Sequence, residues 1–590
     1  MPSCLAAALL FLAATAAPLS AAGRFYQPPP GFVTTQQLAP DFRATIRSLS
    51  FDRRDAFDGT VAHTDLERKV FAFGNRIHVE SRESTLRRRL LFREGGEVTA
   101  DLLAETERVL RAEEFLSDAI IAVRSDSDSC DIMVTTFDQW TTVPGGGLQV
   151  QDLKPGDVFL GRWEKILRDE WYWWAGISEA NVLGTGTKVA AALRHDPIRD
   201  TRSLAFTNNN LTSERLQISA TAAWLSDGDS LIFKINKPLL SRTDRYAYGA
   251  TLTAQENSER VYFDNNRLGE LPAAIAKDAA GKPGLLRVFD RVATQEIALT
   301  ADRSFGTDLK LNIGPTFTFH DHYGHGKLGE PDTALLPYVR LPASALDPEA
   351  RTDALAGAAV SLYKYAYATS RNFRNLKWSE SVPTGWRLSS KAAVNQGWLG
   401  AGDADFRLSE EAAYTGFWSD RAYLNLVGVW QSFVSPSGDF TDGQTDLGGE
   451  AALREHPLTA TWLTASWTSL FAAPQSRQLS LGELNGLTGF PSYYYAGQAR
   501  FLVTAEQRLF PEFEWLTMVP AFAAFVNAGN TFPSASAFAP DDLHYSIGVG
   551  LRLGRSKSTL KVVQHINVTF PLGDDYLKGP VVSILAKKNL

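Results

Sequence analysis

The chain has 590 residues, a net charge of −7 and two cysteines, and these values exclude several classes of protein. The length exceeds that of one ordinary soluble core and allows two to four domains. The negative charge gives no electrostatic basis for binding nucleic acid. Cys4 and Cys130 are too few for a disulfide-stapled scaffold or a multi-cysteine metal site.

Residues 1–22 have the pattern of a secretory signal peptide. An apolar run from Leu5 to Ala17 precedes the small residues at positions 20–22, although no Lys or Arg comes before the run. The run is too short to span a membrane comfortably, and no later segment contains about 18 consecutive apolar residues. We therefore expect cleavage after about Ala22 and no transmembrane helix in the mature chain.

Residues 23–43 predict an extended lead-in with three consecutive prolines, and residues 44–142 predict a small α+β domain. The expected order is strand, helix, helix, strand, strand, with a polar and charge-rich stretch between the first strand and the first helix. The expected strands cover about 45–51, 119–123 and 131–137, and the expected helices cover 83–92 and a segment starting after Thr99. Thr99 is the predicted N-cap of the second helix.

The second helix has a clear amphipathic pattern. Its apolar stripe consists of Leu102, Leu103, Val109 and Leu110, and its predicted solvent-facing side consists of Glu105, Glu107, Arg108 and Arg111. The pattern predicts a helix with one side packed on the sheet.

Residues 160–590 alternate apolar and polar side chains with a period of two. In one such segment Tyr545, Ile547 and Val549 alternate with Ser546, Gly548 and Gly550. A soluble β-sandwich and a membrane β-barrel both predict this pattern. Runs of about 10–14 residues, long enough for a tilted strand to cross a bilayer, favour the barrel. Small or charged residues on the polar side and aromatic clusters near the run ends also favour it.

The number of strands follows less directly from the pattern. Five strands are expected after Phe490, and fourteen candidates precede it from Trp171 onward. Bacterial single-chain barrels have an even number of strands, so an outward loop at this point must follow an odd number. We predict an all-β transmembrane barrel of 16 antiparallel strands, with eleven before the loop, and 18 strands as the alternative.

The domain and the barrel together resemble the outer-membrane assembly and translocation superfamily of the BamA/TamA type, also called the bacterial surface antigen family. Residues 90–96, 107–111 and 115–123 resemble a polypeptide-transport-associated (POTRA) domain. Residues 181–186 look like the family's first barrel hairpin, 481–490 like its sixth extracellular loop, and 504–511 like the strand that follows. The resemblance implies a periplasmic POTRA domain, whose sheet edge pairs with strands of clients or partners, and a loop that enters the barrel lumen.

The loop departs from the family signature in an informative way. Gly489 and Phe490 match it, but Thr488 stands where the family has Arg, and Asn527, two residues before Gly529, stands where the family has the partner Asp. Losing both charges together avoids an unpaired buried charge, which costs about 3–5 kcal/mol. A Thr–Asn hydrogen bond contributes only about 0.5–1.5 kcal/mol. We therefore expect a loop that still enters the lumen but is held more weakly. The C-terminus, Ala586-Lys-Lys-Asn-Leu590, also lacks the family's final aromatic residue.

The sequence contains no motif that indicates catalysis, a cofactor or a metal. Gly-x-Ser-x-Gly, Gly-x-x-x-x-Gly-Lys and His-Glu-x-x-His are all missing. His320, His322 and His325 could bind a divalent ion, but a solvated loop explains them better. Arg500, Glu506 and Arg508 are expected to face the lumen as a solvated, charge-balanced set.

These observations favour a non-enzymatic protein of the outer membrane that assembles, inserts or translocates polypeptides. Its expected partners are outer-membrane lipid, unfolded or secreted client polypeptides, and a periplasmic protein at the POTRA domain. The resemblance also implies a labile seam between the first and last strands. The alternative function is a passive channel or transporter for small solutes.

Overall fold

A computed structural model describes residues 27–587. The exceptions within that range are residues 58–61, 63, 127, 151–171, 197–198, 213, 259, 271, 273–284, 288–290, 326–349, 372–378, 402–404, 419–420, 475–476, 512, 516, 557–562, 575–576 and 578. The predicted signal peptide, Trp171 and the last three residues of the chain therefore lie outside the described residues.

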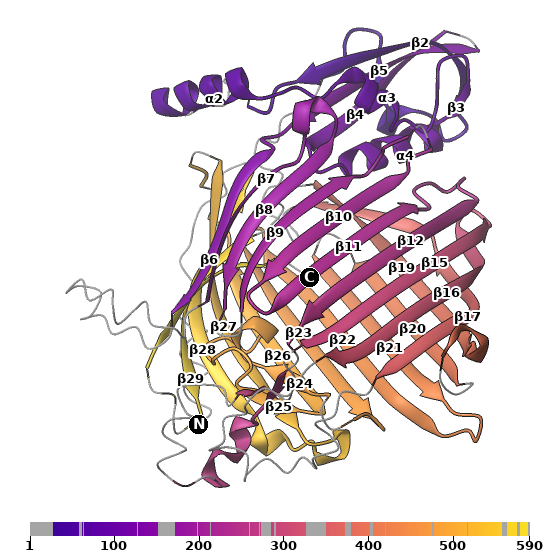
Figure 1. Cartoon of the computed structure of the whole chain (residues 1–590). Coiled ribbons are helices and arrows are strands. Elements are labelled where there is room, and N and C mark those ends of the chain that lie inside the picture. The colour runs from indigo at the N-terminus through magenta and orange to yellow at the C-terminus, as the bar shows by residue number, and fades with distance from the viewer. Residues whose placement is uncertain are drawn as a thin grey trace.

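The N-terminal domain is a five-stranded sheet with three α-helices (Figure 1). The strands are β1 (Val33–Thr34), β2 (Arg43–Arg54), β3 (Glu97–Thr99), β4 (Leu116–Asp126) and β5 (Ser129–Asp138), and the helices are α2 (Asp65–Ile77), α3 (Glu83–Arg87) and α4 (Ala100–Arg111). The strand order is β1-β4-β5-β2-β3, with β2 parallel to β5 and β5 antiparallel to β4. The lead-in strand β1 pairs with part of the edge of β4.

The three predicted strands and the helix after Thr99 are confirmed. The Thr99 side chain accepts a hydrogen bond from Leu102 N, as an N-cap should. The domain core combines Leu103 and Leu110 of α4 with inward residues of all three predicted strands. Other expectations fail. The helix expected over residues 83–92 ends at Arg87 as the short helix α3. The polar stretch before α3 contains the helix α2, and Glu107, expected to face solvent, is buried and accepts from Ile121 N.

Most of the remaining described chain forms one closed antiparallel barrel. Its strands are β6 (Thr142–Val150), β7 (Tyr172–Glu179), β8 (Thr187–His195), β9 (Asp200–Asn208), β10 (Gln217–Leu225), β11 (Gly228–Lys237), β12 (Tyr246–Asn257), β15 (Arg291–Phe305), β16 (Leu309–His325), β17 (Arg351–Lys364), β18 (Ala366–Arg371), β19 (Ser379–Asn395), β20 (Phe406–Trp418), β21 (Ala422–Val434), β22 (Phe440–His456), β23 (Thr459–Phe471), β26 (Ala499–Leu509), β27 (Met518–Phe532), β28 (His544–Arg555), β29 (Val563–Leu572) and β30 (Val581–Lys587). β17 and β18 are consecutive pieces of one strand, since both pair with β19. The described strands thus occupy twenty positions.

The predicted fold class, with 16 or 18 strands after a POTRA domain, is therefore wrong. The five strands expected after Phe490 are present as β26–β30, and fourteen positions from β7 to β23 precede the loop. The missing strand is β6, whose Pro144-Gly145-Gly146-Gly147 segment has the composition of a linker. An even total requires an odd number of strands before the loop. The structure reaches fifteen by adding β6 to the fourteen candidates, whereas the prediction reduced the fourteen to eleven and so discarded three strands that exist. The five-stranded sheet of the N-terminal domain also does not by itself identify a POTRA domain.

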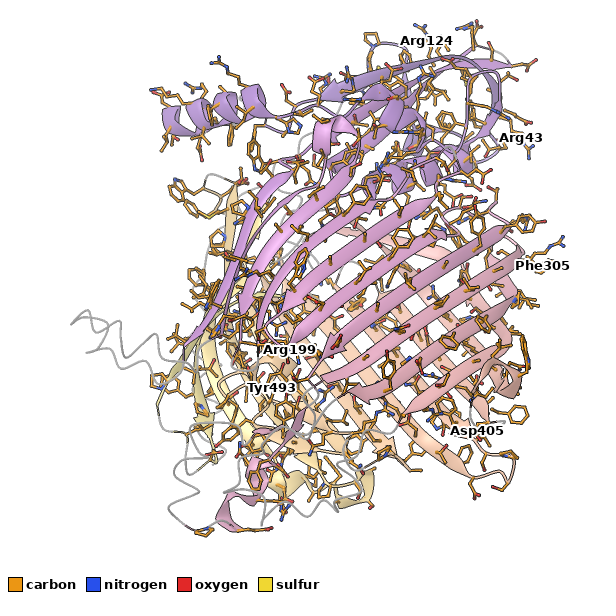
Figure 2. The ribbon with its side chains drawn as sticks, viewed as in Figure 1. Arg43, Arg124, Arg199, Phe305, Asp405 and Tyr493 are labelled. Carbon is orange, nitrogen blue, oxygen red and sulfur yellow. The ribbon has the colours of Figure 1, made fainter. Side chains whose placement is uncertain are left out.

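Side chains alternate between the two faces of the barrel wall. On β28, Tyr545, Ile547 and Val549 are exposed on the outer face, whereas Ser546 and Arg552 are buried on the inner face. The same apolar exterior continues around the barrel, for example at Phe305 (Figure 2). This distribution is the one expected when lipid surrounds a barrel. No helix among the described residues is long and apolar enough to cross a membrane.

The two ends of the barrel carry different structures. The N-terminal domain, with Arg43 and Arg124, sits at one end, here called the domain end (Figure 2). The opposite end, here called the loop end, carries the two-stranded sheets β13–β14 (Arg260–Tyr262 and Leu285–Arg287) and β24–β25 (Leu479–Leu481 and Tyr495–Gly497), together with the 3-10 helix η4 (Asn265–Glu270). Residues 481–490, which resemble the family's sixth extracellular loop, thus lie at the loop end.

Candidate functional site

The segment from Leu481 to Tyr495, here called the luminal loop, folds into the barrel between β23 and β26. Leu481 pairs with Tyr495 at the end of the β24–β25 ladder. Within the loop, Glu483 N donates to Phe490 O, Leu487 N donates to Gly482 O, and Gly489 N donates to the Glu483 carboxylate at 2.6 Å. The loop is therefore a compact unit with its own hydrogen bonds.

Two glycines allow the luminal loop to approach the inner wall closely. Gly486 and Gly489 both have positive φ, at 106° and 95°. A Cβ on Gly489 would lie 2.8 Å from the methyl group of Thr569 on β29, and one on Gly486 would lie 2.6 Å from the Leu502 side chain on β26. Any larger residue at either position would push the loop away from the wall and strain its backbone.

An aromatic cluster anchors the loop. Phe490, Tyr494 and Tyr495 are fully buried with Leu481, Leu487 and Phe263, and Leu502 packs against them. The Phe490 ring lies 5.7 Å from that of Tyr495 and 6.1 Å from that of His544 on β28. The cluster joins the loop, the inner wall and the segment next to β13.

Further polar contacts hold the loop at the loop end. The Tyr495 hydroxyl donates to Asp574 at 2.9 Å, and Asn265 donates to Tyr494 O at 2.6 Å. Asp264 accepts from Ala496 N, and burial raises the pKa of this carboxyl to about 6. Tyr493, labelled in Figure 2, stacks on Tyr262 with centroids 4.9 Å apart. Residues 262–265 and 574, which lie beyond the barrel strands at the loop end, thus hold the luminal loop in place.

Thr488 and Asn527 do not form the hydrogen bond considered from the sequence. Thr488 is buried in the loop, while the Asn527 amide accepts from Thr504 at 2.8 Å and donates to Ser546 at 2.9 Å. Asn527 on β27 therefore links β26 and β28 through hydrogen bonds of its side chain. Gly529 lies further along β27, where a Cβ would be 3.2 Å from the Leu481 side chain.

The three charges expected in the lumen lie on one face of β26 but do not act as one group. Glu506 is buried between Arg508 and Arg552, and Arg552 bonds it through both Nη2, at 2.6 Å, and Nε, at 3.2 Å. Arg500 instead donates to Ser480 O at 3.1 Å, beside the luminal loop. Glu506 and its two arginines therefore form an ion-pair network, and Arg500 contacts the luminal loop. The burial of Glu506 differs from the solvated set of charges that the sequence predicted.

At the domain end, the β7–β8 hairpin docks onto the N-terminal domain. Gly184 O accepts from Arg82 N at 2.9 Å and from the Thr85 hydroxyl at 3.0 Å, and Asn181 donates to the Ser81 hydroxyl at 3.0 Å. Residues 181–186, expected in the first barrel hairpin, instead join the second and third strands, because β6 precedes β7 in the barrel. The hairpin connects the first barrel strands directly to the start of α3.

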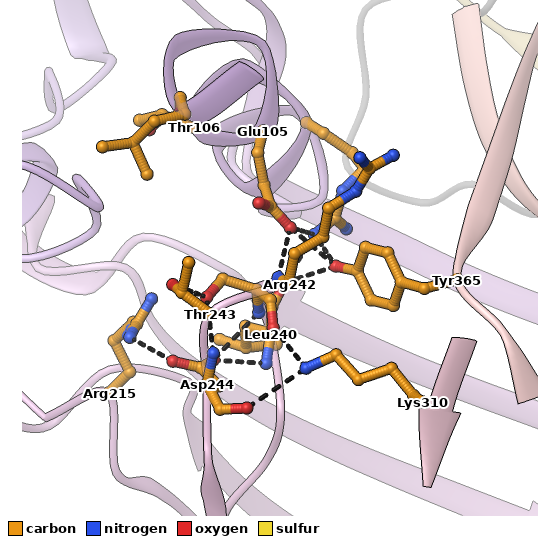
Figure 3. A network of polar contacts seen from close by, with 12 residues as sticks. Glu105, Thr106, Arg215, Leu240, Arg242, Thr243, Asp244, Lys310 and Tyr365 are labelled. Carbon is orange, nitrogen blue, oxygen red and sulfur yellow. Dashed lines mark hydrogen bonds and ion pairs between the residues drawn. The ribbon is translucent and has the colours of Figure 1, made fainter. Parts of the chain in front are cut away.

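Helix α4 makes a second junction with the barrel rim (Figure 3). Glu105 accepts from Arg242 N and from the Tyr365 hydroxyl, each at 2.8 Å. Arg108 donates to the same hydroxyl at 2.9 Å and to Leu240 O. The turn between β11 and β12 and the break between β17 and β18 therefore hold the domain at a fixed place over the rim.

The pairing between the last and first strands is short. β30 pairs with β6 at three described residue pairs, Val582–Val150, Ser583–Gln149 and Ile584–Leu148. By contrast, β29 pairs with β30 at seven positions and β6 with β7 at eight. Closure of the described barrel therefore depends on its shortest ladder.

The described residues give no sign of a metal centre. They contain no group of three or more His, Cys, Asp and Glu side chains that could hold an ion. His320 instead faces Glu296 at 3.7 Å, and His322 bonds the Thr294 hydroxyl at 3.0 Å. The side chain of His325 lies outside the description.

Sequence reasoning missed the residues of both junctions. Glu105 and Arg108 were expected on a solvent-facing side, and Tyr365 was assigned no role. In the structure Tyr365 lies between the two strand pieces β17 and β18. Leu240 and Arg242 carry no signal because their partners are more than 100 residues away in sequence.

No family model and no curated protein matches the sequence. Among solved structures, the chain is similar to BamA from Haemophilus ducreyi lacking POTRA domains 1–3, with 11% identity, a TM-score of 0.36, and coverage of 92% of this chain and 84% of that one. It is also similar to CdiB from Escherichia coli, with 10% identity, a TM-score of 0.42, and coverage of 91% and 76%. It is similar as well to the alcaligin outer membrane receptor FauA from Bordetella pertussis, with 9% identity, a TM-score of 0.36, and coverage of 80% of this chain and 81% of that one. Such low identities and TM-scores establish neither a family nor a function.

Proposed function

We propose that the protein is an outer-membrane barrel that inserts or translocates polypeptides, within the assembly and translocation superfamily. The N-terminal domain lies in the periplasm, acts as a docking module of the POTRA kind, and presents clients to the barrel. No bond is made or broken in this activity, so it requires no catalytic residue, cofactor or metal. The partners are membrane lipid and unfolded or secreted polypeptides.

The observation that supports this proposal best is the short ladder between β6 and β30. Three residue pairs close the described barrel there, against seven and eight in the flanking ladders. Among the described residues this ladder has the fewest pairs, so at about 0.5–1.5 kcal/mol per backbone hydrogen bond its described part costs the least to open. An opened ladder exposes unpaired N–H and C=O groups, which a client strand can pair with by β-augmentation.

Two further features fit this activity. The hairpin of β7 and β8 connects the N-terminal domain to the first strands, so a client held by the domain is delivered next to the β6–β30 seam. The luminal loop packs on the inner face of β26–β29, the strands on the other side of that seam. The same loop narrows the lumen, which is unfavourable for a passive channel.

A disulfide across the seam tests the proposal. Leu148→Cys with Ile584→Cys joins a register pair of β6 and β30, and Ile566→Cys with Ile584→Cys is the matched control across β29 and β30. The full-length protein is reconstituted in vesicles, and the folding rate of a separate barrel protein into them is measured. We expect oxidation to abolish acceleration only in the seam variant, and reduction to restore it.

Two results would contradict the proposal. One is acceleration that survives the seam disulfide. The other is a large, steady ion conductance from the reduced protein without any effect on the folding of other barrels, which would favour the alternative of a solute channel. In cells, depletion of the protein should lower the levels of other outer-membrane barrels.

A further inference from the structure

Helix α2 carries an apolar stripe with no packing partner in the described chain. Leu66, Val70, Phe73 and Ile77 follow the spacing i, i+4, i+7, i+11 along one side of the helix. Their side chains are between 42% and 63% exposed. A helix of a soluble domain normally buries such a stripe in its core.

A different side of α2 makes the contacts with the domain. The Phe71 ring stacks on Phe57, with centroids 5.2 Å apart, and a Cβ on Gly74 would lie 2.6 Å from the Phe57 ring. Phe57 in turn contacts Trp140, which lies two residues before β6. The stripe is therefore left free while the helix is held beside the first barrel strand.

Both ends of α2 are fixed. Thr64 and Glu67 form a capping box, with hydrogen bonds of 3.0 and 3.1 Å. After the helix, His78 lies 3.1 Å from the carboxylate of Asp138, and Ser81 N donates to the same oxygen at 2.8 Å. The direction in which the stripe faces is therefore built into the domain.

The position of α2 relative to the barrel indicates what covers the stripe. The helix extends sideways from the domain on the side of β6 and β7, beyond the barrel wall and away from the mouth (Figure 1). Below it the outer wall exposes Ile177 on β7 and Val189 on β8, and Leu183 is exposed in the hairpin between them. The side of the barrel from which α2 extends therefore also exposes apolar side chains.

Two basic side chains of α2 complement anionic headgroups, while the exposed Asp65 at its start pairs with Arg68 at 2.7 Å. Lys69 and Arg76 flank the stripe on the side away from Phe57, and both are exposed. Long basic side chains beside an apolar stripe are typical of helices that lie in a membrane interface. A neutral or acidic flank would fit a protein partner equally well, whereas this flank favours phospholipids that carry negative charge.

We propose that α2 is an interfacial membrane helix. It lies in the headgroup region of the leaflet at the domain end, with Leu66, Val70, Phe73 and Ile77 inserted toward the acyl chains. Its occupant is an anionic phospholipid surface. The helix fixes the height and orientation of the N-terminal domain beside the β6–β30 seam. This role depends on the barrel lying in a membrane but not on polypeptide insertion, so the two proposals fail separately.

Lipid-borne quenchers test the placement in the full-length protein. Phe73→Cys, and Val70→Cys as a second stripe position, carry an environment-sensitive dye, and Ala72→Cys is the matched control because Ala72 is exposed on another side of the same helix. The unsubstituted chain, whose Cys130 is buried, gives the labelling background. Vesicles contain phosphatidylglycerol and phospholipids with a nitroxide near the headgroup end of the acyl chain. Heat-dependent electrophoretic mobility verifies that each barrel is folded.

We expect severalfold stronger lipid quenching at positions 70 and 73 than at position 72, and the reverse order for iodide in the water. Lys69→Gln with Arg76→Gln should reduce lipid quenching in anionic vesicles more than in vesicles of phosphatidylcholine. Equal quenching at all three positions overturns the proposal, as does free access of iodide to the stripe. Protection of the stripe from both quenchers also overturns it, because a protein would then be the occupant.

Discussion

The ring of Tyr495 in the luminal loop stacks on the ring of His544 at the start of β28, with centroids 4.3 Å apart and planes 10° apart. The hydroxyl of the same tyrosine donates to Asp574 beyond β29. One side chain therefore joins the loop to the inner wall and to the loop end. Such a contact holds the loop inside the barrel without the charge pair seen in the family signature.

Truncation of Phe490 should release this loop. Phe490→Ala removes a fully buried ring from the aromatic cluster, and substitutions of this kind cost about 3–5 kcal/mol. We expect protease cleavage within 481–495 while the barrel remains folded. Phe513→Ala is the matched control because the Phe513 side chain is exposed. A protease-resistant loop in Phe490→Ala would show that other contacts hold it.

Restoring the two missing charges should strengthen the loop only when both are present. Thr488 and Asn527 are both buried, so Thr488→Arg alone or Asn527→Asp alone places an unpaired charge in a poorly solvated site. An Asp at 527 can still accept from Thr504 and Ser546. We expect the double variant to raise the thermal midpoint by more than the sum of the single changes, and Thr488→Gln with Asn527→Asp to lack this gain. Simple additivity would rule the coupling out.

Local sequence patterns predicted much of this fold because the spacing of apolar residues within a strand or helix shows which of its sides is buried. The five strands after Phe490, the core residues Leu103 and Leu110, and the cap at Thr99 all follow from alternation, helical spacing or capping chemistry. The approach of the luminal loop to the inner wall also has a local signal, since Gly486 and Gly489 are needed at positive φ.

The features that could not be predicted depend on distant parts of the chain. In β6, a Cβ on Gly145 or Gly147 would lie within 3 Å of the Trp174 ring, so the strand must have glycine where a strand pattern predicts side chains. The stripe of α2 has no packing partner among the residues that the structure describes, and the composition of its segment is polar. The contact of Tyr365 with Glu105 joins residues 260 positions apart.

The hydroxyl of Tyr365 should control how firmly the domain sits on the rim. Tyr365→Phe removes the hydrogen bonds to Glu105 and Arg108, and hydrogen bonds to charged groups contribute about 1.5–3 kcal/mol each. We expect faster hydrogen exchange in α4 and in the turn at 240–244. Tyr367→Phe is the control because its ring, which packs under Arg108, stays in place. Unchanged exchange in α4 would assign docking to the β7–β8 hairpin alone.

Asp264 gives the docked loop a dependence on pH. Its Oδ1 accepts from Asn266 N, from the Asn266 side chain and from Ala496 N, so Oδ2 is free to carry a proton while all three bonds persist. Burial is the largest influence on this carboxyl and raises its pKa from an ordinary value of 3.8 to about 6.

Docking of the luminal loop should therefore weaken as the pH rises from about 4 to about 6 and then level off. Below this window Asp264 is protonated in both the docked and the released loop. Within it, Asp264 loses its proton at a lower pH in the released loop than in the docked loop, so ionisation favours release. The raised pKa corresponds to about 3 kcal/mol at most, at 1.36 kcal/mol per unit.

Asp264→Asn keeps an acceptor oxygen and mimics the protonated acid, so its loop should be cleaved by protease at a rate independent of pH, after correction for the protease's own pH profile. Asp541→Asn, at an exposed acid of the same end, should retain the dependence of the unsubstituted protein. Equal slopes in the unsubstituted protein and Asp264→Asn would assign the pH dependence to another group.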